Sequence, residues 1–183
     1  MHGARFSPVL SATDMYEIHE REQHFFDQAT LDHLAGFLCL FAKPCCLCAP
    51  LLGAEVEKRG VEVTILDVDE RFANLQGFVR FDLNRPTWLG TRFDVILCDP
   101  PFFKVSLSRL FAALRTLSLY DFRQPLLLSY LTRRETKVLN TFSPFSLRST
   151  GYYPQYQTVE KCERNEIQFY SNLPEEKLAQ LKA

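Results

Sequence analysis

The sequence predicts an α/β protein built on one doubly wound, mainly parallel β-sheet whose last strand is antiparallel. Short apolar stretches alternate with amphipathic stretches along most of the chain, a pattern typical of parallel strands joined by helices. Near the end, two strand-like stretches follow each other without a helix between them, which predicts an antiparallel pair at the sheet edge. The 183 residues suit one domain. A single domain is expected over 1–183, with a flexible lead over 1–22 and a tail over 175–183.

Each element has its own signal in the sequence. Leucines recur at helical spacing from Leu31 to Leu38 and again from Leu107 to Leu114, and Gly60 is expected to end a helix between them. Helices are expected within 21–42, 51–60, 106–120 and 132–142. Strands are expected within 44–50, 61–69, 77–86, 92–102 and 125–131, with the closing antiparallel pair within 145–157 and 165–173.

The fourth predicted strand ends in the letters CDPPFFK. The apolar run from Val95 to Leu97 is long enough for a buried strand. Two prolines then remove backbone N–H donors and hold an extended turn, so the strand must end there. The result is a rigid corner that carries Asp99, free carbonyl groups and an aromatic face. Such a corner can bind a flat or a cationic amine.

Polar or unusual residues also follow the first three predicted strands. In open α/β sheets, ligands bind beyond the carboxyl ends of the strands, where these residues are expected to lie. They are Ala49 and Pro50, Asp67 and Asp69, and Asp82 and Asn84.

Composition and charge limit the class of protein. With 46% hydrophobic and 23% charged residues, the chain has the composition of a soluble globular protein. No window approaches the roughly 20 apolar residues of a membrane span. The first residues lack a basic end followed by an apolar core. An intracellular, cytoplasmic protein without membrane contact is therefore expected, with the nucleus as the alternative.

The net charge and the cysteines carry further expectations. A formal net charge of −1 gives no overall basic field, so a nucleic-acid substrate requires a local patch or a partner protein that delivers it. The six cysteines are expected to be reduced thiols, mostly buried. The letters CCLC at 45–48 are not followed by a second Cys/His cluster, so no metal site is expected.

Several segments resemble one enzyme family. DPPF after an apolar strand resembles the Asp-Pro-Pro-aromatic motif of S-adenosylmethionine-dependent amino-group methyltransferases. The closer resemblance is to the small N6-adenine-methyltransferase-like family that includes an elongation factor 1A lysine methyltransferase and a zinc-finger ribosomal-RNA adenine methyltransferase. His24 stands where this family usually has an aromatic residue. The similar segments are QHFFD at 23–27, CAP at 48–50, LDVDERF at 66–72, FDLNRP at 81–86 and NEIQFYSNLP at 165–174.

The resemblance implies a Rossmann-like class I methyltransferase fold with S-adenosylmethionine as cofactor. The second strand end is expected to supply the acceptor for the ribose hydroxyls, with Asp67 preferred to Asp69. Asp82 is expected to accept the amino group of the cofactor adenine, with an Asx turn or a helix cap as the alternative.

The methionine end of the cofactor needs other contacts, because no G-x-G-x-x-G loop follows the first strand. The resemblance implies that the turn of Ala49 and Pro50 holds this end, together with the entry segment. Phe25 and Phe26 of that segment are expected to line the pocket, with a hydrophobic staple as the alternative.

The corner after the fourth strand is expected to bind the target amine. Asp99 and the carbonyl of Pro100 can accept its two N–H groups, which frees the nitrogen lone pair for attack. Pro101 keeps the turn rigid, and Phe102 is expected to stack on the target ring. Asp99 is also counted among the cofactor-binding residues.

Three functions remain open at this point. Methylation of adenine N6 in RNA or DNA is slightly preferred, because the motif ends in phenylalanine and 13% of the residues are aromatic. Methylation of a protein lysine is the first alternative, and a catalytically silent scaffold is the second. Tyr152, Tyr153 and Tyr156 either line the substrate entrance or pack against the edge strand.

Overall fold

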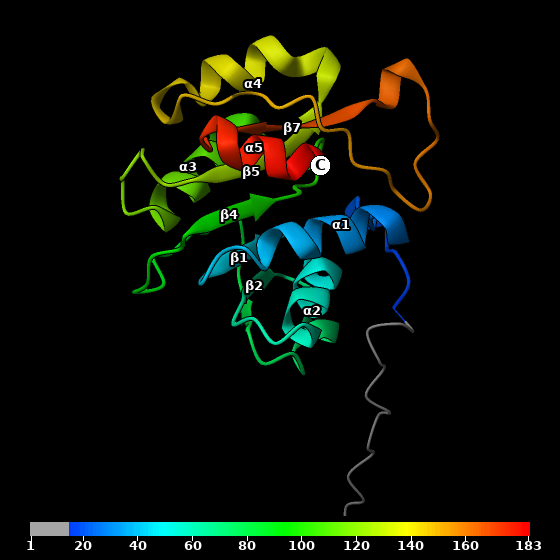
Figure 1. Ribbon diagram of the computed structural model, residues 1–183, viewed down its shortest axis with the longest axis vertical. Coiled ribbons are helices and arrows are strands. Elements are labelled where there is room, and N and C mark those ends of the chain that lie inside the picture. Colours follow the sequence, from blue (N-terminus) through cyan, green and yellow to red (C-terminus); the bar gives the residue numbers. More distant parts are fainter. Residues whose placement is uncertain (1–14) are drawn as a thin grey trace, which may run out of the picture.

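A computed structural model describes residues 15–183 of the chain. Residues 1–14 of the expected lead over 1–22 lie outside the described residues. The rest forms a seven-stranded sheet with helices packed on it (Figure 1). In this part of the chain, no helix has the length and apolar character to span a membrane.

The sheet has the strand order β3-β2-β1-β4-β5-β7-β6. Strands β1 to β5 run parallel, whereas β7 is antiparallel to both β5 and β6. The predicted doubly wound sheet with a reversed last strand is confirmed. The strands are β1 (Pro44–Leu47), β2 (Thr64–Asp67), β3 (Phe78–Arg80), β4 (Val95–Cys98), β5 (Leu126–Leu131), β6 (Arg148–Ser149) and β7 (Ile167–Ser171).

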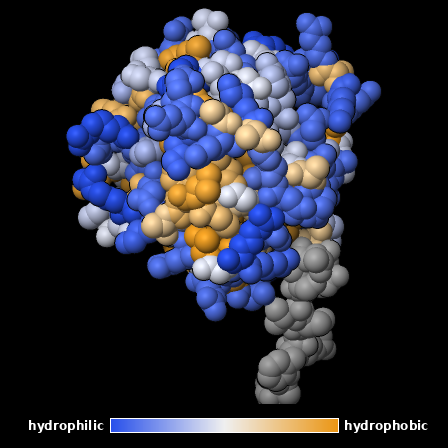
Figure 2. All heavy atoms as spheres, in the orientation of Figure 1, coloured by the Kyte–Doolittle hydropathy of each residue, from blue (hydrophilic) through white to orange (hydrophobic). Residues whose placement is uncertain are grey.

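Helices cover both faces of the sheet. In Figure 1, α1, α2 and α5 lie in front of the sheet and pack together, and α3 and α4 form a second packed pair. Figure 2 shows that hydrophilic residues cover most of the near face, with hydrophobic residues gathered near its centre. The helices are α1 (Gln28–Leu38), α2 (Pro50–Lys58), α3 (Leu107–Leu117), α4 (Glu135–Thr141) and α5 (Glu175–Lys182).

The ends of the helices follow local chemistry. Asp27 caps α1, because its carboxylate accepts the N–H of Thr30 at 2.8 Å. By contrast, α2 begins at Pro50 without a capping side chain, which leaves its first N–H groups open. Gly60 has φ of 81° just after α2, a backbone conformation that glycine adopts without strain, so the predicted end of this helix is confirmed.

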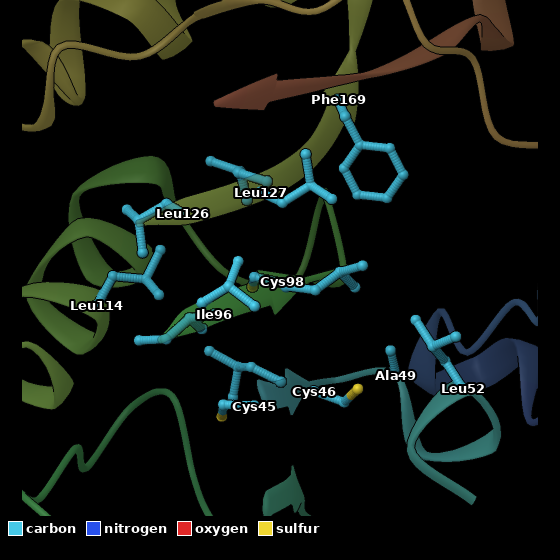
Figure 3. Packing of buried hydrophobic residues seen from close by; sticks show 14 of the residues in the cluster. Cys45, Cys46, Ala49, Leu52, Ile96, Cys98, Leu114, Leu126, Leu127 and Phe169 are labelled. Carbon is cyan, nitrogen blue, oxygen red and sulfur yellow. The ribbon is translucent and has the colours of Figure 1, made fainter. Parts of the chain in front are cut away.

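The core lies on both faces of the central strands. Every residue of β1 and β4 is buried, and Cys45 and Cys46 point away from each other, as alternation along a strand requires (Figure 3). All six cysteines are free. Burial raises the pKa of Cys45 and Cys98 well above the usual value, so both thiols stay protonated and belong to the apolar core.

The third strand is shorter than predicted. It ends at Arg80 instead of continuing to Pro86. The cause is an Asx turn, in which Oδ1 of Asp82 accepts the N–H of Asn84 at 2.8 Å. The turn follows Phe81, whose N–H still donates to the carbonyl of Asp67 at 2.9 Å.

The segment 175–183, expected as a tail, contains the helix α5. Leu178 and Leu181 of this helix are buried. Nε2 of His33 donates a hydrogen bond of 2.6 Å to the carbonyl of Leu181. The helix therefore packs on the sheet layer, and His33 has a structural partner.

Candidate active site

A cavity of about 260 Å³ opens at the carboxyl ends of β1, β2 and β4. It lies where the strand order changes direction between β1 and β4, the usual ligand position in doubly wound sheets. All predicted site residues line this one cavity: Phe25, Phe26, Ala49, Pro50, Asp67, Asp69, Asp82, Asp99, Pro100, Pro101 and Phe102.

Asp99 begins the corner after β4. Its backbone N–H donates to the carbonyl of Leu47 at 3.0 Å, which fixes the corner against β1. Its Oδ1 accepts two hydroxyl groups, from Ser129 on β5 and from Tyr156 at 2.7 Å. No described residue bonds Oδ2, and this oxygen is not among the buried atoms without a partner. Oδ2 therefore remains open to the cavity.

Burial raises the pKa of Asp99 to about 7, although the hydrogen bonds from Ser129 and Tyr156 lower it. Desolvation thus exceeds the effect of the two hydroxyl donors. Near neutral pH the carboxyl group exchanges readily between its two protonation states. Such a group can accept an N–H bond and release or take up a proton within the same pH range.

The aromatic part of the corner is held from behind. The hydroxyl of Tyr130 donates to the carbonyl of Phe102 at 3.1 Å, and the two rings meet edge to face at 5.1 Å. Phe102 is half-buried at the cavity, whereas the side chain of Phe103 is 65% exposed. Of the two phenylalanines, Phe102 is the one placed to stack on a ligand ring.

Glu22 fixes the turn after the corner. One carboxylate oxygen accepts the backbone N–H groups of Phe103 and Lys104 at 3.0 and 3.1 Å. The backbone of Glu22 is left-handed, with φ of 55°, a conformation that costs a non-glycine residue energy. This geometry places a residue of the entry segment beside the corner, where it lines the cavity.

The two acids after β2 have different surroundings. Oδ1 of Asp67 accepts the N–H of Asp69 at 2.8 Å, and no described side chain donates to Asp67. Asp69 instead pairs with Arg71 at 2.6 Å and accepts the amide of Gln23 at 3.0 Å. Asp67 is thus the acid that remains available to a ligand.

The pKa values of these acids differ accordingly. Burial raises the pKa of Asp67 to about 6, and the N–H of Asp69 opposes this shift. Burial also acts on Asp69, but its hydrogen bonds from Arg71 and Gln23 hold the pKa below the usual value. Asp69 is therefore a stably ionised structural acid.

The turn between β1 and α2 brings a helix start to the cavity. Cys48 has φ of 57°, and this left-handed residue directs the chain from the strand into α2. A side chain at Gly53 would place its Cβ 2.5 Å from Cγ1 of Ile65, so the glycine lets α2 lie close against β2. Leu51 and Leu52, in the uncapped first turn, line the cavity. Open N–H groups there can bind a carboxylate.

These features correspond to a known group of enzymes. A family model described as probable N6-adenine methyltransferase matches residues 17–175. The chain belongs to this family. The resemblance predicted from the short motifs is confirmed, and no curated protein is a significant match to the chain.

Solved structures similar to this family member have the same fold. A putative RNA methyltransferase, PH1948 from Pyrococcus horikoshii, has a TM-score of 0.60 and 14% identity over 89% of this chain and 94% of its own. The magnesium protoporphyrin IX methyltransferase of Synechocystis has a TM-score of 0.54 and 16% identity, over 80% of this chain and 79% of its own. At such identities the likeness shows the fold alone, and it confirms the predicted class I methyltransferase fold.

The entry segment of this methyltransferase-fold chain pairs with a segment near the other end. Phe26 and Tyr156 form an antiparallel bridge, flanked by backbone bonds from Asp27 to Gln155 and from Gln157 to Phe25, at 2.8 and 2.9 Å. Phe25 and Phe26 are buried and line the cavity. Both rings therefore form part of the cavity wall.

A cluster of polar side chains fastens the same segment from outside. Nε2 of His19 lies 2.6 Å from the carboxylate of Glu17, which also accepts the hydroxyl of Thr158 and the N–H of Phe25. His24 stacks on His19 at 5.1 Å. Burial lowers the pKa of His24. The histidine at the unusual motif position thus serves this hydrogen-bonded cluster.

The contacts that four residues make with the corner were not predicted from the sequence. Ser129, Tyr130 and Tyr156 contact the corner from distant elements, and Glu22 contacts it from the entry segment. A polar serine within the apolar run LLLSYL was the available signal for Ser129. Tyr156 is expected from the sequence to line the entrance or to pack against the edge strand, and it does line the cavity. Its bond to Asp99 could not be predicted, because the two residues are 57 positions apart.

Proposed function

We propose that this protein is an S-adenosylmethionine-dependent N-methyltransferase that transfers a methyl group to an amino nitrogen at the Asp99–Phe102 corner. The observation that carries the proposal is the shared cavity. One space contacts the acid after β2, the open start of α2 and the corner after β4. A cofactor bound along β1 and β2 therefore lies beside an acceptor for the target amine.

S-adenosylmethionine is the cofactor of this fold and family, as predicted, and the magnesium protoporphyrin IX enzyme has been solved with it bound. We assign the ribose hydroxyls to Asp67, because Asp69 is already held by Arg71 and Gln23. Oδ1 of Asp82 is partly used by its Asx turn, and the remaining oxygen suits the amino group of the cofactor adenine.

The methionine end would lie at the start of α2, where Ala49 and Pro50 form the turn. The N–H groups of Leu51 and Leu52 would bind its carboxylate, since a helix N-terminus stabilises negative charge. Phe25 and Phe26 would exclude water on the opposite side. The chain thereby replaces the glycine-rich loop of other nucleotide-binding sheets.

When bound, the cofactor supplies an electrophilic methyl group on a sulfonium. Oδ2 of Asp99 and the carbonyl of Pro100 accept the N–H groups of the target amine and orient its lone pair. Methyl transfer would release the cofactor as a neutral thioether and would leave the methylated nitrogen with one excess proton. Asp99 is placed to take that proton.

Adenine N6 is our preferred target. Phe102 offers a flat face, and Asp99 is contacted by two hydroxyl groups and no cationic side chain. A neutral aromatic amine fits this setting without burying an ammonium group.

A protein lysine is the second candidate, and the charges of the cavity favour it. The acidic lining residues outnumber the basic ones, and they attract a cation. The acids are Glu22, Asp67, Asp69, Asp82 and Asp99, against Arg21 and Lys104.

Two measurements on the purified protein test the proposal. Calorimetric titration with S-adenosylmethionine is expected to show binding, and its absence would favour a catalytically silent scaffold. Tritiated methyl transfer to total RNA, genomic DNA and a protein extract, run side by side, then identifies the acceptor. Label in N6-methyladenine supports the preferred target, whereas label in methyllysine supports the alternative. Asp99→Ala serves as the inactive control.

A further inference from the structure

Two hydroxyl groups from distant elements meet on one oxygen of Asp99. Ser129 lies in the middle of β5, and Tyr156 lies on the segment that pairs with the entry segment. We propose that Ser129 and Tyr156 are positioning residues whose hydroxyls hold Oδ1 of Asp99, so that Oδ2 alone faces the target amine. This inference rests on the proposed function and adds two residues to it.

Each hydroxyl is fixed by its surroundings. Ser129 is fully buried and lies opposite Phe169 in the pairing of β5 with β7. Tyr156 is 9% exposed, its backbone is bridged to Phe26, and the two rings pack at 5.0 Å. Because neither side chain can turn to water, both donors depend on Asp99 as acceptor.

The two hydrogen bonds to Oδ1 determine how many oxygen atoms of Asp99 can accept a bond from the substrate. A carboxylate free to rotate would present either oxygen, and its geometry toward the nitrogen would vary. With Oδ1 occupied twice, Asp99 offers one oxygen in one direction, and the carbonyl of Pro100 supplies the second acceptor. Because these acceptors are already oriented before the reaction, they do not have to reorient during it, as water molecules would.

The same hydroxyls stabilise the ionised form of Asp99. The charge of Asp99 acts on the thiols of Cys48 and Cys98 and on the phenol of Tyr156, and burial raises the pKa of all three. All three are therefore neutral at physiological pH. The other charged residues that line the cavity make no described hydrogen bond to the carboxylate of Asp99, whose partners are Ser129 and Tyr156. These residues are Arg21, Glu22, Asp67, Asp69, Asp82 and Lys104. Loss of either hydroxyl should thus raise the pKa of Asp99 above about 7.

The decisive experiment is the pH dependence of single-turnover methyl transfer. In Tyr156→Phe we expect the acidic limb of the plot of rate against pH to move to higher pH by roughly one unit. A shift of this size corresponds to the loss of one hydrogen bond to a charged group. The rate then falls about five-fold at pH 7 and recovers near pH 9. Ser129→Ala should shift the limb in the same direction. Tyr120→Phe is the matched control, because Tyr120 is 59% exposed and does not line the cavity.

A purely structural role would lower the rate equally at every pH. If the acidic limb of the plot of rate against pH lies at the same pH in Tyr156→Phe as in wild type, the inference is overturned. If Ser129→Ala fails to fold, as judged by its melting curve, the isosteric Tyr156→Phe still decides the question.

A second readout does not depend on activity. Carbon-13 NMR of aspartate-labelled protein, with Asp99→Asn for assignment, follows the titration of Asp99 directly. We expect a higher titration midpoint in Tyr156→Phe than in wild type, and equal midpoints would contradict the inference. A wild-type protein that transfers no methyl group to RNA, DNA or protein would instead contradict the proposed function, so the two failures are distinguishable.

Discussion

The backbone N–H of Asp69 donates a 2.8 Å hydrogen bond to the carboxylate of Asp67, while the side chain of Asp69 is turned away to Arg71. Two acids that are nearly adjacent in the sequence thus have separate tasks. Asp67 faces the cavity, and Asp69 ties the loop after β2 to the entry segment through Gln23.

This division predicts different losses in two matched variants. Asp67→Ala should weaken S-adenosylmethionine binding by roughly 1 to 3 kcal/mol, because the ribose donors lose a buried acceptor. Asp69→Ala should mainly lower the melting temperature, since it leaves Arg71 without its partner. Calorimetry and thermal unfolding on both proteins separate these effects. Unchanged affinity in Asp67→Ala would remove this residue from the site.

Substitutions at Asp99 should act on turnover more than on cofactor affinity. Asp99→Ala is expected to reduce the single-turnover rate by about 10²-fold, the usual effect of losing one preorganised polar contact. Cofactor affinity should stay within a few-fold, because it depends mainly on the other strand ends. Asp99→Asn should be milder with adenine, because an amide oxygen still accepts an N–H bond. With lysine it should be nearly as damaging as alanine. Wild-type turnover in Asp99→Ala would exclude the catalytic assignment.

The raised pKa of Asp99 also predicts a cost in stability. The folded protein holds the proton up to about pH 7, whereas the unfolded chain releases it near pH 4. The folded state thus binds more protons between these values, and the free energy of unfolding falls as pH rises through this window.

Asp99→Asn lacks this titration. The free energy of unfolding of Asp99→Asn minus that of wild type should therefore increase by about 2 kcal/mol from pH 5.5 to pH 7.5. Urea unfolding of both proteins at several pH values measures the difference. If the two free energies of unfolding differ by the same amount at every pH, Asp99 does not titrate within this pH range.

The contact of Glu22 with the turn after the corner gives another prediction. Glu22→Ala leaves the N–H groups of Phe103 and Lys104 without their acceptor, so the substrate side of the cavity should loosen. We expect KM for the methyl acceptor to rise by about ten-fold, the scale of one lost charged hydrogen bond. Glu22→Gln should recover part of the loss. Steady-state kinetics, with the exposed Glu20→Ala as control, provide the measurement. Equal KM values in all proteins would contradict this role.

Strand and helix positions were largely predictable, because apolar periodicity and proline or glycine boundaries are local properties. The acids after β2 and β4 were predictable for the same reason, since the end of a parallel strand places them at one edge. The contacts of Tyr156 and Ser129 with Asp99 were not predictable, because they join segments far apart in the chain. The predicted length of β3 was wrong, because the Asx turn of Asp82 competes with continuation of the strand. In α5 the buried Leu178 and Leu181 are too few for a clear helical pattern.

The pairing of residues 25–27 with 155–157 has a consequence for synthesis on the ribosome. One wall of the cavity is translated early, but the strand partner that holds it is translated late. β7, translated later still, pairs with both β5 and β6. Until it emerges, β5 has an open edge that can pair with other chains. Nascent chains that stop before residue 157 should therefore neither retain the cofactor nor resist aggregation without chaperones.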